Sequence, residues 1–346
     1  MILAVQGMAC LGSFGPRLED LRARALLCRP LECAGDGGEK HPAALMEGKE
    51  CGRGAVADTS KLKEIFPARS LRQMDHFTRM ALLCAAQALQ DAGAGLTEGN
   101  GRTGVVLSSG YGPAAPTFDF LDSLLLHGER MASPLSFSHS VQNIPAASLA
   151  AKLGIAGPCA TFCQLDAPVA AGLATAWQWL DEERVDRVLF GAVDEHTPLL
   201  ARIAGQLRKR KNPGGDFSAS VPLGEGAAFF CLARGPEGRG GIVRLTLDRR
   251  PPGEVLRSAS ADEEQPRIFL SGAASSGKDF SGARSLHRIY GRIPIAQAFD
   301  IAVSLAPNSE PSPDAPEPPD SLCLSLGPQG TVSCVQTRKG GVIFHA

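Results

Sequence analysis

One stretch, from Gly157 to Glu195, limits what this chain can fold into more than any other. It reads GPCATFCQLDAPVAAGLATAWQWLDEERVDRVLFGAVDE, which predicts a buried strand, a sharp turn, a helix and a second buried strand. Such a turn directs one side chain and several backbone N–H groups toward a common point, an arrangement that suits nucleophilic catalysis. The residue at this turn is Asp166, whose carboxylate is a poor group for attacking an acyl carbon.

Apolar segments alternate with helical patterns along the rest of the chain. Buried strands are predicted at residues 2–8, 103–108, 224–233, 241–247, 267–270, 322–326, 331–337 and 342–345. Helices are predicted at residues 16–25, 70–93, 115–129, 144–154 and 279–290, with Ser70 as the cap of the second one. Residues 31–60, 132–140, 208–215 and 308–320 are expected to form loops. Because the strands are apolar throughout, the pattern indicates an α/β fold with a largely parallel sheet covered on both faces.

Composition excludes several classes of protein. The formal net charge is −1, with 35 Lys and Arg against 36 Asp and Glu, so neither nucleic acid nor an anionic membrane surface is expected as a partner. None of the ten cysteines lies in a C-x-x-C pair and no His/Cys cluster has zinc spacing, so no metal or other cofactor is expected. No run of about 18 apolar residues and no secretory signal is found, which predicts a cytoplasmic protein with free, buried thiols.

Short motifs in the right order resemble those of the β-ketoacyl synthases of the thiolase superfamily. They are Gln6-Gly-Met-Ala, Ala88-Leu-Gln-Asp-Ala-Gly, Ser138-His-Ser-Val-Gln-Asn-Ile-Pro-Ala, Gly157-Pro158, Gly191-Ala-Val-Asp-Glu and Gly224-Glu-Gly-Ala. The resemblance covers most of the chain and is strongest to chain-length-factor subunits of type II polyketide and aryl-polyene systems. It implies a thiolase-like fold in which two βαβαβ-type halves, residues 1–235 and a shortened 236–346, form α/β/α/β/α layers.

The chemistry of this family implies three site features. A cysteine thiolate at a helix N-terminus takes the acyl chain as a thioester, two histidines polarise the malonyl thioester, and a Gly-rich loop near the C-terminus holds the site. Counting forward from Gly157 and back from Gly191 places the cysteine position at Asp166. The first histidine position is Ser271, no Gly-His pair follows it, and the closing loop is changed to Ser325-Leu-Gly-Pro-Gln-Gly-Thr-Val.

Each candidate residue also has a structural interpretation. Asp166 is expected to cap the helix that starts near Ala167. The fallback candidates for chemistry are Cys163, His139 and His196, although an inert buried thiol and satisfied polar residues are the commoner roles. Cys159 is also expected to be an inert buried thiol. The residues expected to shape the wall of the site are Gly157, Pro158, Gly191, Glu195, Gly224, Glu225 and Gly226.

The resemblance implies a subunit without condensing activity of its own. It would pair as a heterodimer with an active ketosynthase subunit, shape that subunit's acyl tunnel in fatty acid, polyketide or polyene biosynthesis, and meet acyl carrier protein through it. The apolar helical surface from Phe118 to Leu126 is expected to pack in the core, with tunnel lining or the subunit seam as the alternative. Two other functions stay open: an active acyl-transfer enzyme with a non-standard site, and a homodimeric acyl-binding or scaffold protein.

Overall fold

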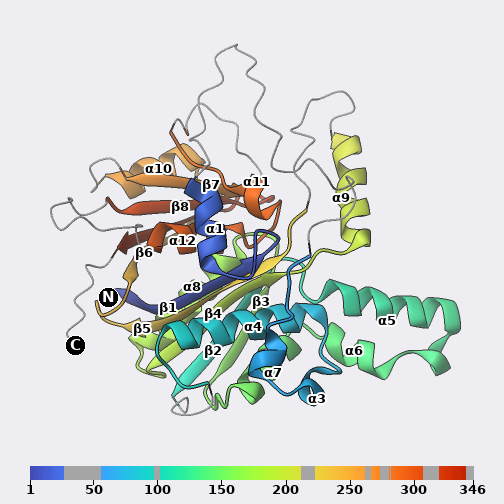
Figure 1. Cartoon of the computed structure of the whole chain (residues 1–346). Helices are drawn as coiled ribbons and strands as arrows, with labels where there is room; N and C mark the ends of the chain where they lie inside the picture. The colour runs from blue at the N-terminus through green and yellow to red at the C-terminus, as the bar shows by residue number, and fades with distance from the viewer. Residues whose placement is uncertain are drawn as a thin grey trace.

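The computed structural model describes residues 1–26, 56–96, 102–211, 223–261, 266–272, 280, 282–306 and 319–339 (Figure 1). Its strands are β1 (Leu3–Gly12), β2 (Thr103–Ser109), β3 (Cys159–Cys163), β4 (Arg187–Asp194), β5 (Gly226–Arg234), β6 (Gly240–Asp248), β7 (Arg267–Gly272), β8 (Ser321–Leu326) and β9 (Val332–Lys339). The helices of the first 200 residues are α1 (Leu18–Leu26), α2 (Leu62–Ile65), α3 (Ala68–Leu71), α4 (His76–Asp91), α5 (Ala114–His127), α6 (Pro134–Ser140), α7 (Ile144–Lys152) and α8 (Pro168–Asp181), with a short 3-10 turn at Glu129–Met131. They are followed by α9 (Pro198–Lys211), α10 (Pro252–Ser260), α11 (His287–Tyr290) and α12 (Ala296–Leu305).

The described strands form one sheet in the order β3-β2-β4-β5-β1-β6-β9-β8-β7. Outward from the seam between β1 and β6, the order β1-β5-β4-β2-β3 on one side is matched by β6-β9-β8-β7 on the other. In the described strands, β1 and β6 pair at two positions only, Leu3 with Ile242 and Ala4 with Gly241. The second side therefore repeats the first, but its described part has no counterpart of β3.

The sheet is mixed, so the prediction of a largely parallel sheet is wrong. Strands pair in parallel at β2–β3, β2–β4 and β7–β8, whereas the other five pairings are antiparallel. The physical reason is that β1 and β5, although antiparallel, are buried along almost their whole length. An antiparallel strand covered on both faces is as apolar as a parallel one, and its sequence does not reveal its direction.

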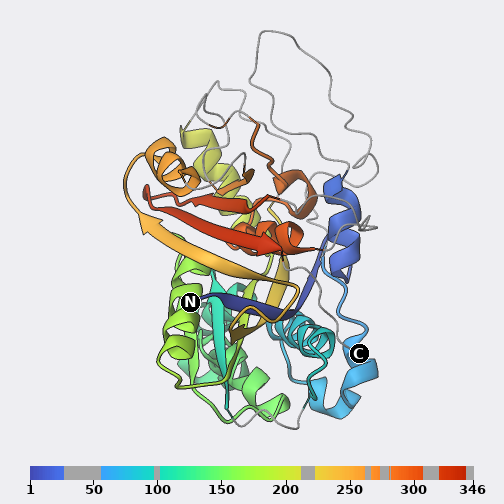
Figure 2. The same cartoon turned by 90° about the vertical axis from the view of Figure 1, so that its left-hand side faces the viewer.

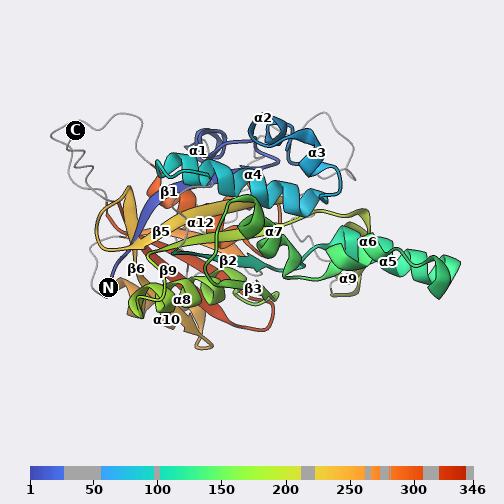
Figure 3. The ribbon, with the colours of Figure 1, turned by 90° about the horizontal axis from the view of Figure 1, so that it is seen from below.

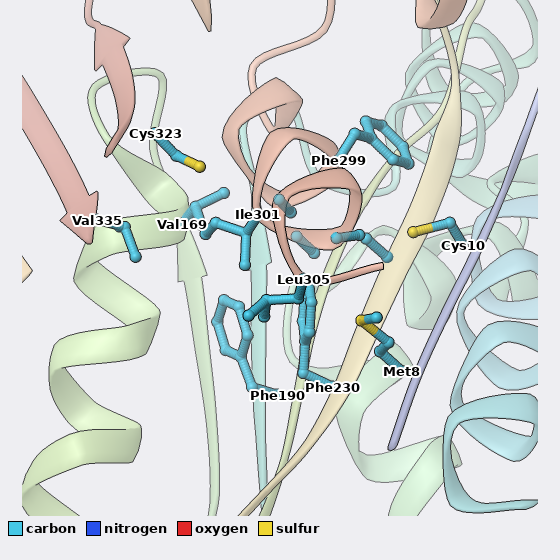
Figure 4. Close-up of a cluster of buried hydrophobic side chains, with 14 of the residues drawn as sticks. Met8, Cys10, Val169, Phe190, Phe230, Phe299, Ile301, Leu305, Cys323 and Val335 are labelled. Atoms are coloured by element: carbon cyan, nitrogen blue, oxygen red, sulfur yellow. The ribbon is translucent and has the colours of Figure 1, made fainter. Parts of the chain in front are cut away.

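Five layers account for the core, and they confirm the predicted α/β fold class (Figure 2). One cluster packs α4 and α7 against the outer face of the first set of strands, and another packs α10 against β7, β8 and β9. The largest cluster lies between the two sets of strands and joins α8 to α12. In Figure 4, Leu305 of α12 lies toward Phe190 and Phe230 of the first set, whereas Phe299 lies on the opposite side of the helix.

Two predicted boundaries in the first half are wrong. Asp75, not Ser70, caps the long helix: its side chain accepts a hydrogen bond from the Thr78 N–H, whereas Ser70 lies in the short α3. The expected loop at 132–140 contains α6, because Ser133 caps a helix whose first residue is Pro134.

The later part of the chain departs further from the prediction. Three helices, α9, α10 and α12, were not predicted, and α9 continues to Lys211, through the start of the expected loop at 208–215. In the expected helix at 279–290, the described residues are α-helical only at His287–Tyr290. The strand predicted at 342–345 and most of the loops expected at 31–60 and 308–320 lie outside the described residues.

Candidate functional site

The turn between β3 and α8 has the predicted position but not the predicted hydrogen bonds. Ala167, the residue before the helix, is left-handed at φ 49°, and no side chain caps the first turn of α8. The Asp166 carboxylate instead accepts hydrogen bonds from the Gln329 N–H at 3.0 Å and the Thr331 hydroxyl at 3.2 Å. The expectation that Asp166 caps the helix is therefore wrong. The left-handed residue lies between Asp166 and the helix, and the carboxylate points to the β8–β9 turn.

An open cleft of about 560 Å³ adjoins this turn. Its walls come from both halves of the chain, and its lining mixes amide, charged and apolar groups: Gln164, Leu165, Asp166, Leu247, Asp248, Arg249, Gln329 and Thr331. Asp166 is thus reached from solvent, while its carboxylate is held by the opposite wall.

Asp194, at the end of β4, holds the loop that follows β2. Its buried carboxylate accepts hydrogen bonds from the Ser109 hydroxyl at 2.6 Å and from the N–H groups of Gly110 and Tyr111 at 3.0 and 2.9 Å. Burial raises the pKa of Asp194 to about 6, although these hydrogen bonds act in the opposite direction. The sequence motif placed Asp194 near the site without indicating this role.

Cys163, a fallback nucleophile, lies beside the same loop. Its sulfur is 3.9 Å from the Gly110 carbonyl oxygen and half-buried. Burial, followed by the negative charge of Asp194, raises the pKa of this thiol. Since the thiolate is the reactive form, these surroundings make Cys163 a poor nucleophile at neutral pH.

Glu225 joins three segments at the other side of the site. Its carboxylate, 1% exposed, accepts hydrogen bonds from the N–H groups of Ala57 at 2.6 Å and His196 at 3.0 Å, and contacts His76 Nε2 at 2.9 Å. Burial is the largest single effect and raises the pKa of Glu225, but the bond to His76, the charge of His76 and the two N–H donors together outweigh it, so the pKa lies below its ordinary value. The same bond raises the pKa of His76. Sequence analysis placed Glu225 in the wall of the site, whereas it did not identify His76.

Glu195 and the two candidate histidines have other partners. Glu195 accepts a hydrogen bond from the Ala115 N–H at 2.7 Å, and burial raises its pKa to about 7. His139 Nδ1 lies 3.7 Å from Asp75 Oδ2, and His196 contributes only its backbone N–H to Glu225. Among the described residues, no hydrogen bond or ion pair links either imidazole with Asp166 or Cys163, so these groups form no nucleophile–base pair.

Ser271, at the family's first histidine position, is buried near the end of β7. Its hydroxyl donates to the Leu324 carbonyl at 3.1 Å. Behind it, the fully buried Asp300 of α12 accepts a hydrogen bond from the Tyr290 hydroxyl at 2.9 Å. Burial raises the pKa of Asp300 to about 7. Sequence reasoning missed Asp300, because α12 itself was not predicted.

The predicted wall residues mostly hold backbones close together. A Cβ at Gly157 would lie 2.2 Å from the Thr103 carbonyl oxygen, and one at Gly224 would lie 1.7 Å from the Tyr290 carbonyl oxygen. Pro158 accepts a hydrogen bond from the Val105 N–H through its carbonyl. In the same way Gly191 leaves room for a Phe229 ring, and Gly226 approaches the Leu11 carbonyl.

An apolar arm, defined as α5, the Glu129–Met131 turn and α6, projects from the body of the molecule (Figure 3). In α5 only Ala114 and Pro116 are buried, so the expectation that residues 118–126 pack in the core is wrong. The helix packs on α6 rather than on the sheet, and its outer side chains remain uncovered. The exposed apolar residues of the arm are Leu121, Leu125, Leu126, Met131, Leu135 and Phe137.

Strand β3 ends the sheet next to this arm. Helix α6 packs on α7, and α7 packs on β3. Cys159, expected to be a buried thiol, is exposed because it begins this edge strand. Of the other described cysteines, Cys10, Cys84, Cys231, Cys323 and Cys334 are free and buried, as predicted. No helix in the described part of the chain is long and apolar enough to cross a membrane.

Comparison with known proteins shows which family and which solved structures this architecture resembles. Residues 4–237 match the family described as "Beta-ketoacyl synthase, N-terminal domain". "The ishigamide ketosynthase/chain length factor" is 17% identical, with a TM-score of 0.73 over 99% of this chain and 100% of the other. A type II polyketide acyl-carrier protein in complex with its ketosynthase gives 13% identity and a TM-score of 0.74, covering 98% and 99%. A β-ketoacyl synthase from Burkholderia phymatum is 14% identical, with a TM-score of 0.68 over 98% of this chain and 100% of the other. At these identities the likenesses establish the fold.

Proposed function

Because this chain belongs to the β-ketoacyl synthase family, we propose that it is a non-catalytic, chain-length-factor-type subunit that pairs with an active β-ketoacyl synthase. The observation that carries the proposal is the state of the nucleophile turn. Its residue is Asp166, whose carboxylate is already hydrogen-bonded to the β8–β9 turn. The nearby Cys163 is held as a thiol, and Ser271 is hydrogen-bonded to backbone. The partner would therefore supply the cysteine and the histidines.

The pairing surface in this proposal consists of the β3 edge and the apolar arm. In the part of the chain that the structure describes, no strand pairs with the outer edge of β3. An exposed edge strand beside an exposed apolar surface favours association, because a partner covers both at once. Leu125 and Leu126 of the arm are 78% and 74% exposed, which is unusual for adjacent leucines in a soluble domain.

The same surface gives the proposed subunit its function. Apolar side chains of the arm would lie against the partner and form part of the wall of its acyl tunnel, in fatty acid, polyketide or polyene biosynthesis. Their size would then limit the length of the product, and acyl carrier protein would dock on the partner rather than on this chain.

Co-expression of this chain with its neighbouring genes tests the proposal, because an active ketosynthase should then be recovered with it. We expect a one-to-one complex by mass in solution, and a change in product length when arm residues are changed in size. Elution of this chain without the ketosynthase would remove the main support, and a self-paired species would favour the homodimeric alternative. A stable covalent adduct on the isolated chain after incubation with acyl thioesters, seen by intact mass, would favour an active acyl-transfer enzyme.

A further inference from the structure

We infer that Asp166 is a positioning residue: its carboxylate is the resident ligand of the β8–β9 turn and closes the nucleophile turn from within the chain. This inference deepens the proposed loss of catalysis and rests on it for its functional meaning. The contact itself belongs to the isolated chain and needs no partner.

The contact joins two parts of the chain that are far apart in sequence. Asp166 lies 163 residues before Gln329 and 165 before Thr331. Asp166 Oδ1 accepts from the backbone of Gln329, and Oδ2 accepts from the Thr331 side chain, so both carboxylate oxygens are engaged. Hydrogen bonds to a charged carboxylate are stronger than those between neutral groups. The carboxylate therefore ties the second half of the chain to the turn before α8.

The β8–β9 turn has one outward-pointing backbone donor, and Asp166 uses it. The Gly327 N–H donates to the Thr331 carbonyl at 2.8 Å, and the Gly330 N–H donates to the Gly327 carbonyl at 3.1 Å. Pro328 has no N–H. Only the Gln329 N–H remains among positions 327–330, and it donates to the carboxylate.

Gly327 supplies the space that the contact needs. A Cβ at this position would lie 2.2 Å from Asp166 Oδ1 and 2.8 Å from Asp166 Cγ. The backbone of Gly327 is not in the left-handed region, so alanine can adopt its conformation. Gly327→Ala thus displaces the carboxylate without altering Asp166. An acyl carbonyl that entered this turn would have to compete with the Asp166 carboxylate for the Gln329 N–H. The carboxylate has the advantage, because it is tethered and therefore has a high effective concentration at that N–H.

Hydrogen exchange at the Gln329 amide of the isolated chain tests the inference. We expect Asp166→Ala to speed that exchange about tenfold, since the amide loses a charge-assisted bond. Asp166→Asn should fall between wild type and Asp166→Ala, because its amide oxygen still accepts from Gln329 but carries no charge. Asp181→Ala, at the exposed far end of the same helix, is the matched control and should change nothing.

The double variant gives the decisive comparison. Gly327→Ala alone should speed exchange as Asp166→Ala does, and Asp166→Ala with Gly327→Ala should be no faster than either, because both remove one contact. Unchanged exchange in Asp166→Ala or in Gly327→Ala, or additive effects in the double variant, would overturn the inference. Capture of the co-expressed ketosynthase by the same variants is measured separately, so failure of pairing is not confused with failure of this contact.

Discussion

Replacing Asp300 with Asn should change how the stability of this protein depends on pH. Asp300 is fully buried on α12, and its Oδ2 has no hydrogen-bond partner among the described residues. Burial raises its pKa from 3.8 to about 7, so folding favours the neutral acid. The contribution of neutral Asp300 to the free energy of unfolding is complete below about pH 4 and is lost as the pH rises through about 7. A shift of this size corresponds to about 4 kcal/mol, of which about 2–3 kcal/mol falls between pH 5 and 8.

Urea unfolding of both proteins at pH 5, 6, 7 and 8 measures this difference. Asn keeps an oxygen for the Tyr290 hydroxyl and does not ionise. From pH 5 to 8 the free energy of unfolding of the variant should therefore rise by about 2–3 kcal/mol relative to that of wild type. Asp194 and Glu195 titrate in both proteins and cancel in the comparison. Two stability curves that stay parallel from pH 5 to 8 would refute the reasoning.

Three further predictions concern the arm, the Glu225 contacts and the turn before α8. Leu125→Glu with Leu126→Glu should abolish ketosynthase capture in a pull-down while changing the free energy of unfolding in urea by less than about 0.5 kcal/mol. The control Leu26→Glu, at an exposed position on α1, should leave capture intact. Glu225→Gln should lower the pKa of His76 toward its ordinary value in an NMR titration, and an unchanged pKa would contradict the assigned contact. Asp166→Cys should give no condensation product from the isolated chain, as measured by product analysis, because no histidine is hydrogen-bonded or ion-paired to this turn among the described residues.

The order of the elements could be predicted, but the direction of the strands could not. Apolar runs and glycine turns located β2, β4 and β5 correctly, because burial on both faces dictates their composition. Helix α12 was not predicted, although its polar residues Gln297, Asp300 and Ser304 fall at helical spacing on one face. That face is buried, because the Gln297 side chain donates to the Cys323 carbonyl and Ser304 hydrogen-bonds with Thr337. In α6, by contrast, the signal was present, since Ser133 followed by Pro134 is typical of a helix start.

The candidate site could be located from the sequence, but its contacts could not be derived. Spacing from Gly157 and Gly191 placed Asp166 at the turn between a strand and a helix, where the structure has it. Its two partners lie more than 160 residues away, and no local pattern connects them. His76 was missed similarly, because its link to Glu225 spans 149 residues.

The two ends of the sheet differ in a way that controls how molecules can assemble. Beyond β7, the Leu270 N–H donates to the Arg284 carbonyl and the Arg284 N–H to the Ile268 carbonyl, each at 2.8 Å, so this edge is partly occupied by the chain itself. The β3 edge has no such cover in the described residues. Among the described residues, strand addition is therefore favoured at the β3 edge over the β7 edge. If two molecules pair through their β3 strands, both open edges are covered. The result is a closed pair that does not grow into a filament.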